Sequence, residues 1–301
     1  MKDGTKTVTT ERRGGSGMPQ SGILMKGLES VQNPSDFLEA GFGRPMVPPI
    51  ALTRYLYIKE EVLTSLALSI FEKQKDEALF WAYELFNSGF QECAMEFLIA
   101  VYREMFKADN PRLENFLNAK YDEWNADRTL THVLGTMVIN LCDPTRKFNV
   151  EGFITQEFPP STKTKDSAFY IMFSEDATKK YDTVSDETPR LILEKACIYS
   201  VRKNANAVFK CGHVDLSADQ LKDMLFYKWI YYASFSPIWM DRILQYGGTV
   251  DHDTTSVEFL EPDDFYSVYG FEPDEQKPDV LRKLMGCGEK QMTEREFIEK
   301  Y

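Results

Sequence analysis

Between residues 57 and 141, apolar side chains recur every three or four positions, and only short polar breaks interrupt this spacing. Because an α-helix turns once every 3.6 residues, the spacing gathers these side chains on a face that packs against a neighbour. It predicts five helices, at residues 57–71, 77–88, 91–107, 112–124 and 130–141. The connections are short, so successive helices are expected to lie antiparallel, as a stack of helical hairpins.

Turn and cap residues mark the boundaries of these helices. Gly89 follows the second helix, where a left-handed cap is needed. Asn110 followed by Pro111 predicts a side-chain cap and a proline at the first position of the fourth helix. In the first helix Val62, Leu63, Leu66, Ile70 and Phe71 recur at spacings of three and four. This one-sided stripe predicts a helix that packs through one face.

The second half of the chain returns to helical spacing. Helices are expected at residues 189–203, 221–234, 238–246, 263–269 and 278–284, with a last capped turn at 293–296. Ser217 and Gln220 form a capping-box pattern before the aromatic helix 221–234. Residues 249–250 and 256–259 flank a polar turn and predict a small β-hairpin. The predicted fold is therefore mainly α, with stacked helical hairpins, an irregular insert and a small β-hairpin near the C-terminus.

Four segments follow from these patterns. Residues 1–50 are rich in Gly, Ser, Thr and Pro and predict a flexible tail, because they carry too little apolar surface to offset the entropy of ordering. The other three are an N-terminal helical-hairpin subdomain (51–142), an irregular insert (143–188) and a C-terminal helical subdomain with the β-hairpin (189–301). Within the insert, the aromatic run 169–173 fits either a strand or a buried helical turn. The two helical subdomains are expected to share one core.

Composition limits the class of protein. No run of about 18 apolar residues is present, so no membrane-spanning helix is expected. The amino-terminal segment lacks the apolar core of a secretory signal, which favours a location inside a cell. Five scattered cysteines indicate reduced thiols: Cys93, Cys142, Cys197, Cys211 and Cys287. With 35 Lys+Arg against 47 Asp+Glu, the net charge of −12 opposes nucleic-acid binding by the whole surface.

Metal and catalytic patterns are sparse. The one close pair of potential zinc ligands is Cys211 with His213, and Cys197, His252 and Cys287 are the distant candidates. Structural zinc usually takes two close pairs, so no metal site is predicted. A flanking carboxylate could orient His252 as a general base, but no nucleophile motif accompanies it, and a solvated turn histidine is the simpler interpretation. No catalytic residue and no cofactor is predicted.

Two charged regions leave alternatives open. The stretch 251–276 has no Lys or Arg, and its carboxylates include Asp251, Glu258, Glu261, Asp263, Asp264, Glu272, Asp274 and Glu275. It could meet a basic partner or imitate phosphate, although a solvated acidic rim is the simpler interpretation. The clustered basic residues are Arg12, Arg13, Lys163, Lys165, Lys179, Lys180, Arg202, Lys203 and Lys210. A local positive face built from the last five would support nucleic-acid binding, but no recognised motif accompanies it.

The aromatic residues of the second half are the candidates for a protein interface. Trp and Tyr give a large contact area at a low entropic cost, so they anchor many interfaces. Most of this set is expected to face the core, because the helix that carries it is so apolar. The residues predicted to bind a partner are Trp229, Tyr232, Trp239 and Arg242.

Three groups of residues together resemble an uncharacterised protein family of the nucleocytoplasmic large DNA viruses, the giant viruses. They are 57–60 with 77–85 and 88–90; 236–239 with 242–243 and 247–248; and 269–276. The resemblance covers roughly residues 50–280, and it implies a viral origin and a location in the host cytoplasm, a viral factory or the virion. Residues 76–111 are also similar to the helical collar domains of clamp-loader-related proteins, which implies only a helical assembly role.

The function expected from the sequence is that of a non-enzymatic helical scaffold or adaptor in a viral assembly, acting on a viral or host protein. Helical stacks offer grooves between hairpins in which a partner segment can lie. The alternative is a nucleic-acid-associated factor in replication or transcription. An enzyme with a divergent site is the least favoured of the three classes.

Overall fold

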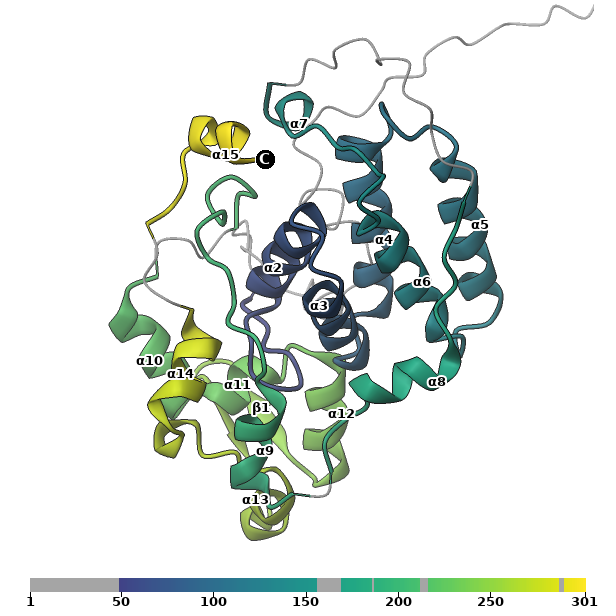
Figure 1. The fold of residues 1–301 in the computed structure, drawn as a ribbon. Helices are drawn as coiled ribbons and strands as arrows, with labels where there is room; N and C mark the ends of the chain where they lie inside the picture. Colours follow the sequence, from purple (N-terminus) through teal and green to yellow (C-terminus); the bar gives the residue numbers. More distant parts are fainter. Residues whose placement is uncertain (1–48, 156–168, 186, 212–215, 287–289) are drawn as a thin grey trace, which may run out of the picture.

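A computed structural model describes residues 49–155, 169–185, 187–211, 216–286 and 290–301 (Figure 1). The described residues form a mainly helical protein with one two-stranded antiparallel sheet, which confirms the predicted fold class. Residues 1–48 of the expected tail lie outside the described residues.

The N-terminal helices are α2 (Lys59–Phe71), α3 (Lys75–Asn87), α4 (Gln91–Val101), α5 (Leu113–Ala126) and α6 (His132–Leu141). All five begin within two residues of the predicted positions. The fourth ends two residues later than predicted. The third ends earlier, because a π-helical turn, η3 (Tyr102–Phe106), replaces its last residues. Helix α3 contacts α2, α4 and α6, so it lies at the centre of this block.

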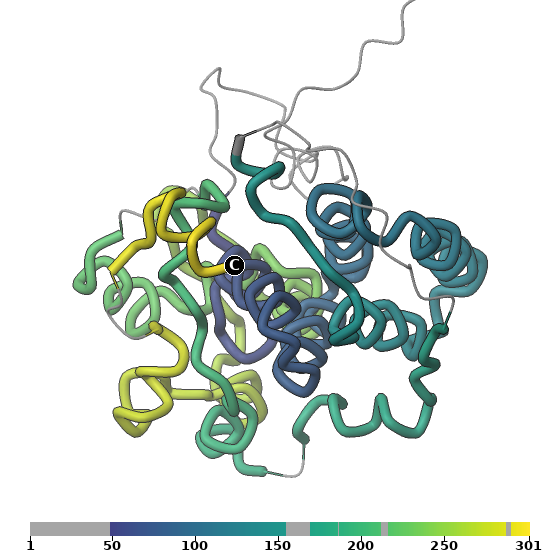
Figure 2. Tube along the Cα trace, turned by 45° about the horizontal axis from the view of Figure 1, so that its top comes forward, coloured from purple at the N-terminus to yellow at the C-terminus, as the bar shows by residue number. Residues whose placement is uncertain are grey.

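Helix α2 differs from its prediction, because it is buried on all sides and not on one. Every residue from Glu61 to Phe71 is buried. The other helices of the block cover one side of α2, and the C-terminal half of the chain covers the other (Figures 1 and 2). Two of its buried hydroxyls are satisfied within the helix: Ser65 and Ser69 donate to the carbonyls four residues earlier, each at 2.7 Å.

The prediction of a side-chain cap at Asn110 is wrong. The residue before α5 is Arg112, which makes no side-chain cap. The Asn110 amide instead donates to Phe106 O at 2.8 Å and to Lys147 O at 2.6 Å. A buried amide must find partners, and here the nearest carbonyls belong to the π-helical turn and to the insert.

The C-terminal half contains α9 (Pro189–Ala196), α10 (Ala218–Tyr227), α11 (Trp229–Ala233), α12 (Pro237–Gln245), α13 (Pro262–Tyr269), η5 (Pro273–Glu275), α14 (Pro278–Met285) and α15 (Glu294–Lys300). The predicted β-hairpin is present as β1 (Thr249–Asp251) and β2 (Ser256–Glu258), with Val250 opposite Val257. Capping boxes at Ser217 and Thr293 are confirmed.

Two helices of this half are shorter than predicted. Helix α9 ends at Ala196, seven residues before the expected end. The aromatic helix 221–234 is two helices, α10 and α11, because Lys228 leaves the helical conformation at φ −129°. The break changes the direction of the chain, so Trp229 and Ile230 are buried while Tyr227, just before the break, is 77% exposed.

In the described residues of the insert, 143–155, 169–185 and 187–188, the helices are short: α7 (Glu151–Thr155), α8 (Glu175–Thr178) and η4 (Lys179–Tyr181). Residues 169–173 form neither of the two predicted structures. Their backbone pairs with side chains of α6: the Ile171 N–H donates to Asn140 Oδ1 at 3.0 Å, and Asn140 Nδ2 donates to Ile171 O at 2.7 Å. Phe173 N–H donates to Thr136 Oγ1 at 3.0 Å. Side chains of a helix therefore satisfy this backbone in place of a second strand.

A loop before α2, residues 51–58, joins the parts of the fold, and the buried side chains form one continuous cluster around it. Leu52 N–H donates to Tyr232 O at 3.2 Å. Trp239 Nε1 donates to Thr53 O at 3.0 Å, and Tyr57 Oη donates to Tyr199 O at 2.8 Å. These three hydrogen bonds fix the central loop against the C-terminal half of the chain.

Arg54, in the central loop, forms a buried ion pair with Glu84 of α3. Its Nε lies 2.9 Å from Glu84 Oε2, and the two side chains are 3% and 0% exposed. The other guanidinium nitrogens donate to Tyr181 O at 2.8 Å and to Thr183 Oγ1 at 3.0 Å. Glu84 Oε1 also accepts from the Tyr55 N–H at 3.1 Å. One side chain thus connects the central loop, α3 and the insert.

The C-terminal helix α15 is attached to the end of α2. Phe297 is fully buried, and the Tyr301 ring lies 5.7 Å from the Phe71 ring. Glu72 accepts hydrogen bonds from Tyr301 Oη at 2.7 Å and from Arg202 Nη1 at 2.5 Å. Burial alone would raise the pKa of Glu72, but these hydrogen bonds and the Arg202 charge hold it below its usual value of 4.5.

Because the pKa of Glu72 is lowered in the folded protein, its ionised form stabilises the attachment above about pH 4.5, and this contribution is lost as the pH falls further. We expect the hydrogen-exchange protection of α15 to fall between pH 5 and pH 3, before that of α3. In a Glu72→Gln variant the protection of α15 should be lower at pH 7 and should fall less over this range, with the remaining decrease coming from the capping carboxylate of Glu296, whose hydrogen bonds from Thr293 hold its pKa below its usual value. Equal protection of α15 at pH 5 and pH 3 in the unmodified protein would contradict the role given to Glu72.

Candidate functional site

The structure does not bring the proposed metal ligands together where it describes them. Cys197 Sγ lies 3.9 Å from Tyr55 O, whereas Cys211 Sγ lies 3.5 Å from Thr64 Oγ1. His213 and Cys287 lie outside the described residues. Within the described ranges, no three His, Cys, Asp or Glu side chains form a group that could hold a metal ion. In the same ranges, no helix combines the length and apolar character needed to cross a membrane.

His252 lies exposed at the turn of the β-hairpin, with Nδ1 3.3 Å from Tyr231 Oη. The neighbouring Asp251 carboxylate accepts the N–H groups of Asp253, at 2.8 Å, and Thr254, at 3.2 Å. A hydrogen bond with the Thr254 side chain, followed by these two backbone hydrogen bonds, lowers the pKa of Asp251. Asp251 therefore shapes the turn and does not orient the imidazole as a base.

Four of the basic residues considered for nucleic acid are engaged in ion pairs. Lys203 lies 3.0 Å from Glu61, and Arg202 binds both Glu72 and Glu77. Lys179 and Lys180 lie 2.9 Å from Asp176 and 3.6 Å from Asp76, respectively. Arg12, Arg13, Lys163 and Lys165 lie outside the described residues. Acidic neighbours thus offset the positive charge of these four side chains.

Three of the four residues predicted to bind a partner belong to the core instead. Trp239, Trp229 and Arg242 are 0%, 7% and 8% exposed. The Trp229 and Trp239 rings meet edge to face at 5.3 Å, and both pack on Phe271. The Arg242 guanidinium lies 4.4 Å from the Trp239 ring. These side chains offer no contact surface, because the central loop and the segment after α13 cover them.

Tyr232, the fourth predicted residue, is partly buried beside Tyr231, with the two rings 5.3 Å apart. Its backbone carbonyl accepts the Leu52 N–H, which fixes the end of α11 against the central loop. Tyr232 is therefore the one member of the set that keeps part of its side chain at the surface.

A different surface of the same region exposes apolar side chains. Leu260 is 86% exposed, Leu244 61% and Tyr266 40%. Leu244 is on α12, Leu260 follows β2, and Tyr266 is on α13. We call the surface formed by these side chains and the carboxylates beside them the α12–α13 face. It lies at the base of the molecule in the view of Figure 1, at the opposite end from α7 and α15.

Local structure connects the segments that carry the three apolar side chains. Helix α12 ends with Gly247 at φ +66°, a left-handed conformation that glycine adopts without strain. The Gly247 N–H donates to Leu244 O at 3.0 Å, and a Cβ on Gly247 would lie 4.0 Å from Leu260 Cδ1. Phe259, beside Leu260, stacks on Phe265 at 4.3 Å and meets the Tyr266 ring at 6.2 Å. The buried Phe265 thus anchors the strand end and α13 together.

Each exposed apolar residue of the face has a carboxylate close to it in the sequence. Asp241 precedes Leu244 by three residues on α12, and Asp263 precedes Tyr266 by three on α13, which places each pair on one side of its helix. Glu258 ends β2, two residues before Leu260, and Glu261 follows Leu260 directly. All three carboxylate residues are exposed, as is Glu261.

These carboxylates lack the ion-pair partners that most charged side chains elsewhere on the described surface have. Within the part of the chain that the structure describes, Asp241, Glu258, Glu261 and Asp263 form no ion pair, whereas the nearby Glu275 pairs with Arg190 and Glu194 with Lys277. The face therefore joins apolar side chains to unneutralised negative charge.

The acidic character of this face follows from the sequence, but its apolar members do not. Leu244 and Leu260 belong to segments where most apolar residues are buried, and only the geometry of the α12 terminus and of the hairpin turns them outward. Comparisons with protein-family models, with curated proteins and with solved structures find no match for this chain.

Proposed function

We propose that the protein is a non-enzymatic interaction protein that binds a basic, amphipathic helix of a partner protein on the α12–α13 face. The observation that supports this proposal is the pairing of each exposed apolar side chain with a carboxylate that has no cationic neighbour. An amphipathic helix with Lys or Arg beside its apolar stripe presents the complementary pattern.

Both parts of the face contribute to the proposed binding. Burying a leucine side chain contributes about 1.5–3 kcal/mol, so Leu244 and Leu260 supply the main attraction. The exposed carboxylates speed the encounter with a cationic partner and favour it over other partners. Ions screen this second contribution, so binding weakens as salt is added.

The charge of the protein argues against a second copy as the occupant. With a net charge of −12, two copies repel each other, and a symmetric contact would bring the carboxylates of both faces together. A basic partner meets no such repulsion. Following the resemblance to the giant-virus family, we propose that the partner is a viral or host protein and that the role is that of a scaffold or adaptor in a viral assembly.

A designed Leu/Lys amphipathic peptide, labelled with a fluorophore, tests this proposal by fluorescence anisotropy. We expect binding at 50 mM salt that weakens as salt is raised. Leu260→Asp should weaken it by about 10- to 100-fold, because an apolar contact is lost and a carboxylate is buried. The thermal unfolding midpoint should change little, since Leu260 is 86% exposed.

Met172→Asp is the matched control, because Met172 is 55% exposed and lies on the insert, outside the α12–α13 face. It adds the same charge as Leu260→Asp and should leave the affinity for the peptide unchanged. Absence of binding at 50 mM salt, or equal weakening by the two substitutions, would contradict the proposal.

A further inference from the structure

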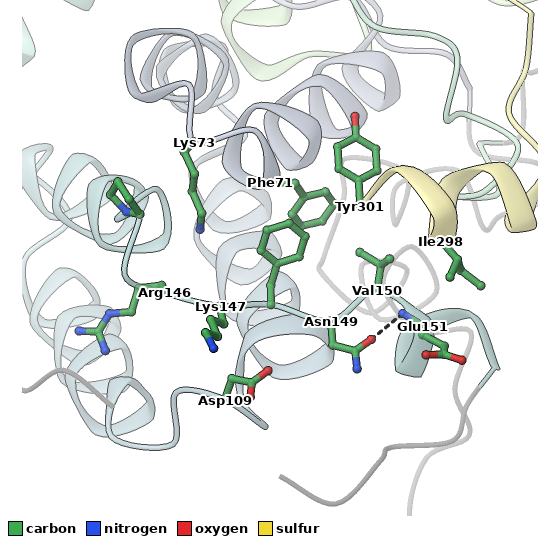
Figure 3. A pocket seen from close by; sticks show the side chains of 12 residues that line it. Phe71, Lys73, Asp109, Arg146, Lys147, Asn149, Val150, Glu151, Ile298 and Tyr301 are labelled. Carbon is green, nitrogen blue, oxygen red and sulfur yellow. Dashed lines mark hydrogen bonds between the residues drawn. The ribbon is translucent and has the colours of Figure 1, made fainter. Parts of the chain in front are cut away.

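At the opposite end of the molecule, a cleft of about 610 Å³ lies between the end of α2, the chain before α7 and α15 (Figure 3). A volume of this size suits a small molecule. Phe71, Phe148, Ile298 and Tyr301 supply apolar lining, and Lys73 and Lys147 supply positive charge. In Figure 3 the two lysines lie on one side of the cleft, and Ile298 and Tyr301 lie on the other.

The backbone at Lys73 is unusual for its residue type. Lys73 N–H donates to Ile70 O at 3.1 Å, and the next N–H, of Gln74, donates to Ser69 O at 2.8 Å. This is the pattern that ends many helices, and it needs a left-handed residue, usually glycine, at the position of Lys73. Lys73 occupies it at φ +59°. A strained residue at the rim of a cleft is typical of a functional position.

The Lys73 side chain is held over aromatic rings. Its Nζ lies 4.8 Å from the centre of the Phe106 ring and 5.2 Å from that of Phe148. It donates one hydrogen bond, to Leu141 O at 2.9 Å, of the three that an ammonium group can make. The ammonium group is thus fixed in position and retains donors for a ligand in the cleft.

We propose that this cleft binds a small organic anion, whose acidic group contacts Lys73 and whose apolar body lies against the apolar lining formed by Phe148, Ile298 and Tyr301. Lys147 adds a second positive charge on the same side. The third basic residue of the lining, Arg146, is 1% exposed and donates to Phe169 O at 3.0 Å, so it contributes charge and no direct contact.

The protonation of Lys73 provides a test of this proposal. Burial lowers the pKa of Lys73 to about 8, and Arg146 acts in the same direction, while Cys142 and Asp143 oppose them. An anion beside the ammonium group favours its charged form. Binding of the anion is therefore coupled to proton uptake, and the affinity should fall by up to tenfold per pH unit above about pH 8.

The other groups around Lys73 do not produce this pH dependence. Burial raises the pKa of Cys142 to about 12, and hydrogen bonds from Thr145 hold that of Asp143 below its usual value despite the opposing effect of burial. Asp109 and Glu151 line the cleft as carboxylates, and Lys147 and Arg146 as cations. A step near pH 8 would therefore report Lys73.

The test uses 8-anilinonaphthalene-1-sulfonate as the anionic probe and N-phenyl-1-naphthylamine as its uncharged analogue, both followed by fluorescence. We expect the sulfonate to bind at least tenfold more tightly at pH 7, and its advantage to disappear by pH 9.5. Lys73→Met should remove both the advantage and the pH dependence. Lys73→Arg, which stays charged, should retain binding at pH 9.5. Lys222→Met, an exposed lysine on α10, should behave as the unmodified protein.

Equal affinity for the two probes at pH 7, or a step near pH 8 that persists in Lys73→Met, would overturn this proposal. Lys73→Arg keeps the side chain charged and similar in length. If Lys73→Arg binds the sulfonate normally and Lys73→Met does not, the loss of binding comes from the missing charge and not from a change in the fold. The peptide affinity of the α12–α13 face should be the same in all three variants, so the two proposals succeed or fail separately.

Discussion

Replacing Arg54 by Met is expected to lower the free energy of unfolding by about 3–5 kcal/mol. The substitution removes the positive partner of Glu84, whose side chain is fully buried, and leaves that carboxylate without compensation. It also leaves Tyr181 O without the guanidinium donor that it has at 2.8 Å. Urea unfolding followed by far-ultraviolet circular dichroism measures the effect.

Two further variants test the origin of this loss. Arg54→Met combined with Glu84→Leu removes both charges and should recover part of the stability, although the Tyr55 N–H then loses its acceptor. Arg295→Met breaks an exposed ion pair with Glu299 and should change the unfolding free energy by less than about 0.5 kcal/mol. Similar losses for Arg54→Met and Arg295→Met would contradict the importance of the buried pair.

Replacing Trp239 by Ala is expected to cost about 3–5 kcal/mol of stability, because a fully buried indole is removed from the core. The Trp229, Tyr269 and Phe271 rings lose their central contact, and Thr53 O loses the Nε1 donor at 3.0 Å. A loss of this size would indicate that Trp239 supports the core, whereas the sequence suggests a residue of a partner interface. Urea unfolding again provides the measurement.

Trp239→Phe separates the two contributions of the indole. It retains most of the ring packing and removes one of the two donors to Thr53 O, which still accepts the Leu56 N–H at 2.9 Å, so its cost should be about 0.5–1.5 kcal/mol. A Trp239→Ala variant that unfolds within 1 kcal/mol of the unmodified protein would show that this side chain does not support the core.

Features that depend on local sequence could be predicted. The capping boxes at Ser217 and Thr293, the Gly247 terminus of α12 and the pairing of the β-hairpin each involve residues a few positions apart. Their hydrogen bonds form between neighbours in the chain, so the residue types alone indicate the structure.

Features that depend on contacts across the fold could not be predicted. Arg54 and Glu84 are 30 residues apart, and neither belongs to a pattern that indicates an ion pair. Asn110 has the right residue type for a cap, but α5 begins after Arg112, and the Asn110 amide nitrogen donates to Phe106 O and Lys147 O. The break at Lys228 has no glycine or proline to mark it.

In the candidate sites, too, the features that depend on contacts across the fold could not be predicted from the sequence. An amphipathic helix can turn its apolar face toward the core or toward a partner, and the central loop with the segment after α13 places Trp239 of α12 inside. Leu260 directly follows Phe259, which is partly buried against the Phe265 ring. The turn after β2 leaves Leu260 itself 86% exposed. The sequence does not indicate a role for Lys73, because its position near the Phe148 ring requires the insert to fold back on α2.

We propose that the α12–α13 face is where the protein binds its partner. Amide and methyl chemical-shift mapping by NMR, with the Leu/Lys peptide added to the isotope-labelled protein, tests this claim most directly. We expect the largest changes at Leu244, Leu260, Tyr266 and their neighbours, with none at Lys73 or Phe148. Changes centred on the buried Trp229 and Trp239 cluster or on the cleft of Lys73, with the α12–α13 face unaffected, would contradict it.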